Sequence, residues 1–268
     1  MVDRGKHNIL GVLVDTVDYA AATERILLAA RDRQGFAATA LAVHGLVLGH
    51  RDRVQRYRLN HFDLVTPDGQ PVRWMLNLKY GARLQDRVYG PALMLRLCKA
   101  AAQERLPVYF YGSSGAVVER LAKNLKTRIP ELIVAGFEPS RFRRLTPGEK
   151  EDLCARVKQS GARLLFVGLG CPRQEIFAFE FREDMAMPVV AVGAAFDYHS
   201  GFLREPPATM QRLGLQWLHR LLQEPGRLWR RYFEMNSAFL VAVCLQMLGW
   251  AKPNPLDTEA PCGDILHG

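Results

Sequence analysis

The segment from Leu164 to Gly201 restricts the possible folds more than any other part of the chain. Two apolar runs, 164–168 and 189–192, flank a helical pattern that opens at Pro172, and each run ends in a glycine turn. A strand, a helix and a second strand at this spacing form a βαβ unit whose strands run parallel. The segment therefore predicts an α/β protein with a parallel sheet.

The same alternation of apolar runs and helical patterns fills the first 205 residues. Further strands are expected near 8–14, 36–44, 62–65, 107–111 and 132–136, with helices between them, the first of which starts at Asp15 or Thr16. This order is typical of a Rossmann-like, mostly parallel sheet that carries helices on both faces. We therefore expect one large α/β core over residues 1–205.

The pattern changes after Pro207. Residues 208–250 are helical in character, with arginines interleaved with tryptophans and leucines, and residues 238–251 carry no charge. This uncharged run is too short to span a bilayer, and it suits either a membrane surface behind a basic flank or packing against the core. We expect a helical, membrane-associating appendage over 206–251 and a flexible tail over 252–268. Because an apolar helix needs cover when no membrane is present, a homo-oligomer is compatible with this pattern.

Charge and cysteine content narrow the classes of function. The 268-residue chain has a formal net charge of +9, which favours anionic partners such as nucleic acid, acidic lipid or a phosphate-bearing substrate. Its five cysteines are scattered without a CxxC pair, which argues against a disulfide framework or a zinc site and suits the reducing cytoplasm. The N-terminus has no signal-peptide pattern, and no run of about 18 uncharged apolar residues could span a membrane. A cytoplasmic protein without a metal site is therefore expected.

Polar side chains follow several of the expected strands, at the sheet edge where ligands bind in open α/β folds. Gln174, Glu175 and Asp197 follow the two strands of the βαβ unit. Asp68 stands in a Pro-Asp-Gly turn after another strand, where a carboxylate either stabilises its own turn or serves as a general base. Glu175 is explained adequately by the positive end of the helix dipole.

Three further features carry weaker signals for a ligand. His44 ends the strand expected over 36–44, where a histidine is either half-buried or faces a ligand. Gly112 and Ser113 begin a Gly-Ser-Ser-Gly turn that resembles a phosphate-binding turn but lacks both the GxGxxG pattern and the Walker lysine. The chain has no DxD motif for a divalent cation, so an enzyme acting on a nucleotide-activated substrate would need arginines to neutralise the diphosphate. The C-terminal segment supplies such arginines, although charge runs also solvate helix faces.

Five motifs, in consistent order between residues 8 and 232, together resemble the WecG/TagA/CpsF family of bacterial glycosyltransferases. They are FDLVTPDG from Phe62, RVYG from Arg87, VGLGCPRQE from Val167, VGAAFD from Val192 and GLQWLHRL from Gly214. The resemblance implies an inverting, metal-independent transferase that needs no cofactor. Such an enzyme moves a sugar from a UDP-sugar donor to a polyprenyl-diphosphate-linked acceptor at the cytoplasmic face of the membrane. The resemblance also implies that a C-terminal appendage binds the membrane and completes the active site.

Carried over residue by residue, the resemblance assigns Asp68 as the base that deprotonates the acceptor hydroxyl. Other matching positions are expected to bind the substrates: Arg87, Gln174 and Asp197 in the cleft, and Arg220, Arg227 and Arg231 at the diphosphate. Spacings of seven and four would place the three appendage arginines on one face of an unbroken helix, although Pro225 lies between the first two.

Two positions depart from the family pattern. The first strand of the family often ends in a Thr-x-Asn pair that helps to hold the donor sugar; here no Asn follows Thr39, and His44 is the candidate for its place. The usual Glu of a Gly-Leu-Glu-Trp motif is Gln216. The resemblance is closer to members associated with exopolysaccharide assembly.

Two other classes of function stay open at this point. A nucleotide-dependent oxidoreductase on a Rossmann core would carry GxGxxG and a downstream acidic residue, which are absent. A nucleic-acid-binding protein would fit the net charge, but arginines concentrated beside an apolar segment suit lipid better. The leading expectation is a peripheral enzyme on the inner face of the cell membrane, with no nucleic-acid partner.

Overall fold

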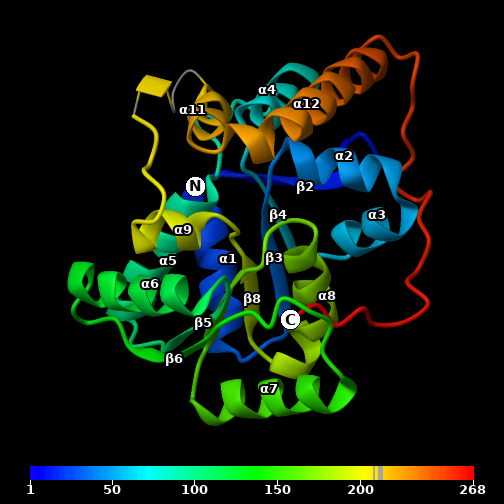
Figure 1. Cartoon of the computed structure of the whole chain (residues 1–268). Coiled ribbons are helices and arrows are strands. Elements are labelled where there is room, and N and C mark those ends of the chain that lie inside the picture. The colour runs from blue at the N-terminus through cyan, green and yellow to red at the C-terminus, as the bar shows by residue number, and fades with distance from the viewer. Residues whose placement is uncertain (208, 211–213) are drawn as a thin grey trace.

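The computed structural model describes residues 1–207, 209–210 and 214–268, with only the backbone of residues 227, 228, 231 and 232 (Figure 1). A six-stranded sheet in the order β4-β3-β8-β7-β5-β6 forms its centre. All neighbouring strands of this sheet are parallel. Its strands are β3 (Phe36–Leu41), β4 (Leu64–Pro67), β5 (Val108–Gly112), β6 (Val134–Glu138), β7 (Leu164–Gly168) and β8 (Pro188–Ala191). The predicted Rossmann-like parallel sheet is confirmed.

Helices cover both faces of the sheet because alternate strand side chains enter two separate apolar cores. Phe110, Phe166 and Val190 belong to one core, whereas Tyr111 and Val167 belong to the other. The first core packs against α1 (Tyr19–Arg31), α5 (Gly90–Gln103), α6 (Gly115–Arg128) and α9 (Ala195–Ser200). The second packs against α2 (Val43–Arg51), α3 (Arg53–Asn60), α4 (Gln70–Tyr80), α7 (Pro147–Gln159) and α8 (Arg173–Met185).

The N-terminal region differs from its prediction. The strand expected over 8–14 is a hairpin of β1 (Asp3–Ile9) and β2 (Val12–Val17), because Leu10 and Gly11 have positive φ values of 54° and 90° and turn the chain. Helix α1 starts at Tyr19 because the Asp18 carboxylate caps it and accepts the amide of Ala21 at 2.8 Å. The proposed cap Asp15 is instead buried in β2, where it accepts the amide of Val65 and pairs with Arg25.

The strand expected over 36–44 is also shorter than predicted. Strand β3 ends at Leu41, and the following segment forms α2 and α3, which meet at Asp52. The Asp52 carboxylate accepts the amides of Val54 and Gln55 and so starts the second helix. His44 therefore lies in the first turn of α2 and not at the end of a strand.

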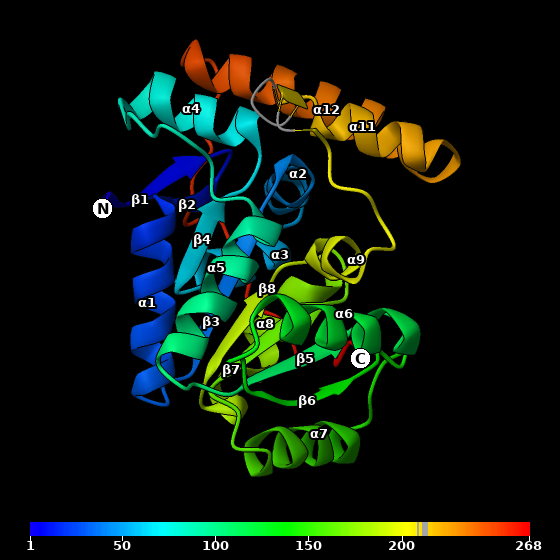
Figure 2. The same ribbon diagram turned by 90° about the vertical axis from the view of Figure 1, so that its left-hand side faces the viewer.

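The appendage consists of α11 (Gln216–Gln223) and α12 (Pro225–Met247), which lie beyond the carboxyl edge of the sheet beside α4 (Figure 2). Phe239 of α12 is buried in the core next to α2 and α4, so the appendage packs on the α/β unit. Large apolar side chains of α12 and of the residues directly after it are exposed: Trp229, Phe233, Leu240, Val241, Leu248 and Trp250. Among the residues that the structure describes, no helix combines the length and apolar character needed to cross a bilayer.

The C-terminal tail, which the sequence predicts to be flexible, follows a defined path along the core (Figure 1). Asp257 pairs with Arg53 and Arg56, and Asp264 pairs with Lys150. Glu180 is buried in α8, and its carboxylate accepts the amides of residues 265 and 266 at 2.9 Å each. The last residue, Gly268, accepts a hydrogen bond from the Ser140 hydroxyl at 2.6 Å. The tail thus supports the loop between β6 and α7, while its flexibility stays a prediction.

Candidate active site

A cavity of about 1010 Å³ lies between the carboxyl ends of the strands and the appendage. Its walls come from the turns after β3, β4, β7 and β8 and from α11 and α12. The structure places seven of the predicted site residues in this lining: His44, Asp68, Arg87, Ser113, Gln174, Asp197 and Arg220. Residues far apart in sequence therefore meet at the sheet edge that the βαβ pattern indicates.

Three predicted site residues do not contribute a described side chain. Gly112 is absent from the described lining, and a Cβ there would lie 2.9 Å from the backbone of Gly168. It also has a φ of 118°, so its absent side chain permits the close approach of β5 to β7. The side chains of Arg227 and Arg231 lie outside the described residues. Because α11 ends before Glu224, they do not share an unbroken helix with Arg220.

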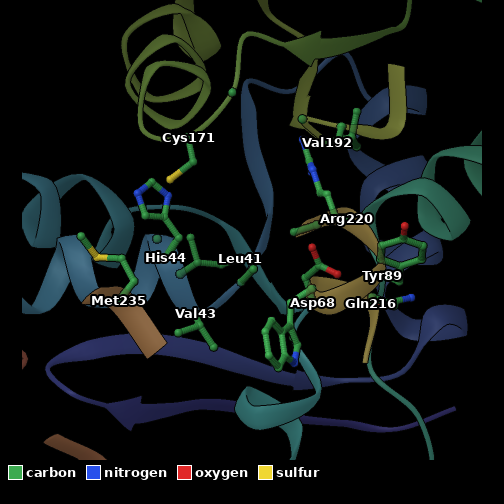
Figure 3. Close-up of a pocket in the computed structure, with 18 of the residues that line it drawn as sticks. Leu41, Val43, His44, Asp68, Tyr89, Cys171, Val192, Gln216, Arg220 and Met235 are labelled. Carbon is green, nitrogen blue, oxygen red and sulfur yellow. The ribbon is translucent and has the colours of Figure 1, made fainter. Parts of the chain in front are cut away.

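Asp68 follows β4 and points its carboxyl group into the cavity (Figure 3). Its side chain is 18% exposed, and Oδ1 has no hydrogen-bond partner among the described residues. Burial raises the pKa of Asp68 to about 6, although Arg87, the amide of Gly90 and Arg220 each act to lower it. A carboxylate with such a pKa is ionised at neutral pH and is still basic enough to accept a proton.

Two arginines approach this carboxylate from different elements. The guanidinium of Arg87 donates to the backbone oxygen of Asp68 at 2.9 Å and lies 3.8 Å from its Oδ1. The same guanidinium stacks over the ring of Tyr89, 4.4 Å from its centroid, so its position is fixed. Arg220 comes from α11, and its side chain extends toward Val192 in the same cavity (Figure 3). Its charge acts to lower the pKa of Asp68, so the appendage adds positive charge to the cavity of the candidate base.

Gln174 and Glu175 form a buried pair in the cavity wall, at the first turn of α8. The Gln174 amide donates through Nε2 to Glu175 Oε1 at 2.9 Å, and Thr39 of β3 donates its hydroxyl to the same oxygen at 3.1 Å. Burial raises the pKa of Glu175, against hydrogen bonds from Gln174, its own backbone amide, Thr39 and Cys171. Glu175 stands in the first turn of α8, and it also lines the cavity.

His44 forms part of the opposite wall. Its ring points toward the sulfur of Cys171, and Met235 of α12 lies beside it (Figure 3). These side chains join the first turn of α2, the turn after β7 and the appendage. His44 is half-buried and lines the cavity, and its role in binding a ligand stays a prediction.

The sequence reasoning gave too little weight to Thr39, Glu175, Tyr89 and Trp217. Tyr89, Glu175 and Trp217 lie inside the recognised motifs, which was the available signal. Thr39 is a buried strand residue whose importance comes only from its contact with Glu175 across 136 positions of sequence. No group of three or more His, Cys, Asp or Glu side chains that could hold a metal ion occurs in the described part of the chain.

Comparison with known proteins agrees with this geometry. The family model described as "Glycosyl transferase WecG/TagA/CpsF family" matches residues 7–253. A relative from Bacillus spizizenii is 30% identical over 197 residues, covering 73% of this chain and 74% of the relative. That protein is named N-acetylglucosaminyldiphosphoundecaprenol N-acetyl-beta-D-mannosaminyltransferase. The matched region includes every element that lines the cavity.

Proposed function

We propose that this chain, which belongs to the WecG/TagA/CpsF family of glycosyltransferases, transfers a sugar from a UDP-sugar to a polyprenyl-diphosphate-linked acceptor. The name of the Bacillus relative, which specifies a diphosphoundecaprenol-linked acceptor, supports the acceptor class. We place the reaction in the assembly of a cell-surface polysaccharide such as an exopolysaccharide. We assign no donor sugar, because no Asn follows Thr39, where the family often has one, and His44 is only the candidate for its place.

The observation that carries this proposal is the pairing of a buried carboxylate with arginines at one cavity. The Asp68 carboxylate lines the cavity and would accept a proton from an acceptor hydroxyl, while the charges of Arg87 and Arg220 act on it. In our mechanism the acceptor oxygen loses its proton to Asp68 and bonds to the anomeric carbon of the sugar. The bond from that carbon to the diphosphate breaks, and UDP leaves with the electron pair. A single displacement of this kind inverts the anomeric configuration.

Arginines would take the role that a divalent cation has in other transferases. Charge builds up on the diphosphate as its bond to the sugar breaks, and guanidinium groups bind phosphate bidentately while staying charged. Arg220 is the described candidate because its Nε has no hydrogen-bond partner among the described residues and its ion pair with Glu224 is long, at 3.6 Å. Arg227 and Arg231 remain proposals from their sequence positions. We therefore propose that transfer needs no added metal ion.

The exposed apolar side of the appendage supports a peripheral location at the inner face of the cell membrane. Trp229, Phe233 and Leu240 expose 59%, 70% and 61% of their surface and also line the cavity that would receive the lipid-linked acceptor. An apolar helix face beside basic residues binds the surface of a bilayer that contains anionic lipid. A homo-oligomer that covers this face away from membranes stays a prediction.

The experiment that tests the function is transfer from a UDP-sugar panel to a synthetic polyprenyl-diphosphate-linked N-acetylglucosamine, with EDTA present. We expect the wild type to form a disaccharide lipid and Asp68→Asn to form none while still binding UDP. Asp52→Asn, which alters a helix cap far from the cavity, is the control and should retain activity. A wild type that transfers no sugar from any UDP donor would overturn the proposal.

Membrane association needs its own assay. Leu248→Glu and Trp250→Glu place charge on the exposed apolar side without touching the core, and should abolish co-sedimentation with vesicles containing phosphatidylglycerol. Leu28→Glu is the matched control, because Leu28 is 52% exposed on α1, away from the appendage. Equal loss of binding in the control would show that the appendage face is not the membrane contact.

A further inference from the structure

The cavity wall contains the side-chain amide of Gln174, and a hydrogen bond to the neighbouring Glu175 fixes its orientation. Gln174 is 4% exposed and Glu175 is 1% exposed, so both side chains are removed from bulk water. Gln174 Nε2 donates to Glu175 Oε1, and Gln174 Oε1 has no hydrogen-bond partner among the described residues. A buried carbonyl oxygen without a partner costs folding free energy unless something else binds it.

The neighbours of the amide define which way this oxygen faces. A Cβ on Gly193 would lie 3.1 Å from Gln174 Oε1 and 3.5 Å from Nε2, so the oxygen lies against the turn that follows β8. Gly193 itself lines the cavity. The carbonyl of Gln174 is therefore directed at the cavity wall next to the strand end, and its NH₂ group is directed at Glu175.

The two ends of a glutamine amide have nearly the same shape, so only hydrogen bonds select its orientation. Glu175 Oε1 accepts hydrogen bonds from both Gln174 and Thr39. It therefore carries no proton that it could donate to the oxygen of a flipped amide. A flipped amide would bring two acceptor oxygens together and leave the NH₂ group without its carboxylate. Glu175 thus favours one orientation of Gln174.

We propose that Glu175 is a positioning residue that holds the Gln174 amide so that its Oε1 accepts a hydrogen bond from a hydroxyl group of the donor sugar. This inference rests on the proposed glycosyltransferase function. It gives Glu175 a role beyond the stabilisation of a helix start, and it makes Gln174 an acceptor rather than a donor toward the sugar.

A double-mutant cycle tests this coupling. Glu175→Leu removes the acceptor and frees the amide, and Gln174→Ala removes the amide itself. Each single variant should raise the KM for the UDP-sugar about three- to tenfold, the value of one neutral hydrogen bond, with a smaller change in kcat. The double variant should be no worse than Gln174→Ala, because Glu175 has nothing left to orient. A merely structural Glu175 would give additive losses.

Two further variants keep the test decisive if Glu175→Leu does not fold. Glu175→Gln retains a carbonyl oxygen that can accept from Thr39 and Gln174, so it should restore a KM close to that of the wild type. Gly193→Ala, at a φ of 53°, should displace the Gln174 carbonyl and raise the donor KM, and this increase should be smaller in the Gln174→Ala background, where only the backbone strain is left. A KM loss in Glu175→Gln as large as that in Gln174→Ala would overturn the proposal, as would additive losses in either cycle.

The failure of this inference can be told from the failure of the proposed function. Absence of turnover by the wild-type protein with every UDP-sugar rejects the function. Wild-type turnover combined with additive cycles rejects only the positioning role. Thermal unfolding of each variant, measured alongside, shows whether a change in KM accompanies a general loss of structure.

Discussion

Replacement of Asp68 by asparagine should stabilise the folded protein at neutral pH, since a neutral group of the same shape takes the place of a buried carboxylate. Burial raises the pKa of Asp68 from 3.8 to about 6, more than the nearby arginines lower it. Each pKa unit corresponds to about 1.4 kcal/mol, so a shift of about two units costs the folded state about 3 kcal/mol once the carboxyl is ionised. Asp68→Asn removes that cost.

The sign of the pH dependence follows from the direction of the shift. A carboxyl whose pKa is higher in the folded state favours folding fully below its unfolded pKa, near 4, and loses this contribution as the pH rises through about 6. The free energies of unfolding of the wild type and of Asp68→Asn should therefore be similar near pH 4. They should diverge above it, with the variant more stable by about 3 kcal/mol at pH 7.5.

Urea unfolding followed by circular dichroism between pH 4 and pH 8 measures this difference. Asp18→Asn is a control of opposite sign: burial raises the pKa of Asp18, but the amides of Ala21, Val2 and Ala20 and the N-terminal charge together lower it by more. That variant should be less stable than the wild type at pH 7.5, and the difference should shrink as the pH falls through the folded-state pKa. An Asp68→Asn protein that is less stable than the wild type at pH 7.5 would refute the reasoning, because the arginines would then outweigh burial.

Three further predictions concern the cavity and its supports. The transfer rate of the wild type should rise with pH through about 6, where Asp68 loses its proton, and a rate that is flat between pH 5 and pH 8 would count against Asp68 as the base. Arg220→Ala should lower kcat/KM by about 10- to 100-fold, which corresponds to the loss of a hydrogen bond to a charged group. Arg220→Lys should recover part of this loss. Wild-type kinetics in the alanine variant would show that Arg220 does not bind the diphosphate. Deletion of residues 260–268 leaves the buried carboxylate of Glu180 without two amide donors. In urea titrations this deletion should lower the free energy of unfolding by about 1–3 kcal/mol. An unchanged unfolding midpoint would show that the tail does not support the core.

The sheet could be predicted from the sequence because its central strands are buried on both faces. Runs such as 164–168 and 189–192 are continuously apolar, and a pattern of this kind signals a central parallel strand without reference to distant residues. The same apolar pattern could not distinguish the N-terminal hairpin of β1 and β2 from a single strand. Its turn consists of Leu10 and Gly11, both with positive φ; Gly11 is a common turn residue, but a leucine rarely adopts this conformation and gives no turn signal.

The site was predictable where its residues stand at strand ends within motifs. Asp68, Gln174 and Asp197 meet at one cavity because the carboxyl ends of parallel strands share an edge of the sheet. Hydrogen bonds between residues that are distant in the sequence could not be predicted in this way. The hydrogen bond from Thr39 to Glu175 joins two elements through the core, and neither residue type nor local spacing reveals it.

The central claim is that Asp68 activates the acceptor for sugar transfer with inversion. The most direct measurement is a nuclear magnetic resonance determination of the anomeric configuration of the lipid-linked product, made with the wild type and Asp68→Asn side by side. The account predicts a product of inverted configuration from the wild type in the presence of EDTA and no product from a folded, UDP-binding Asp68→Asn protein. A product of retained configuration, or turnover by Asp68→Asn at the wild-type rate, would contradict it.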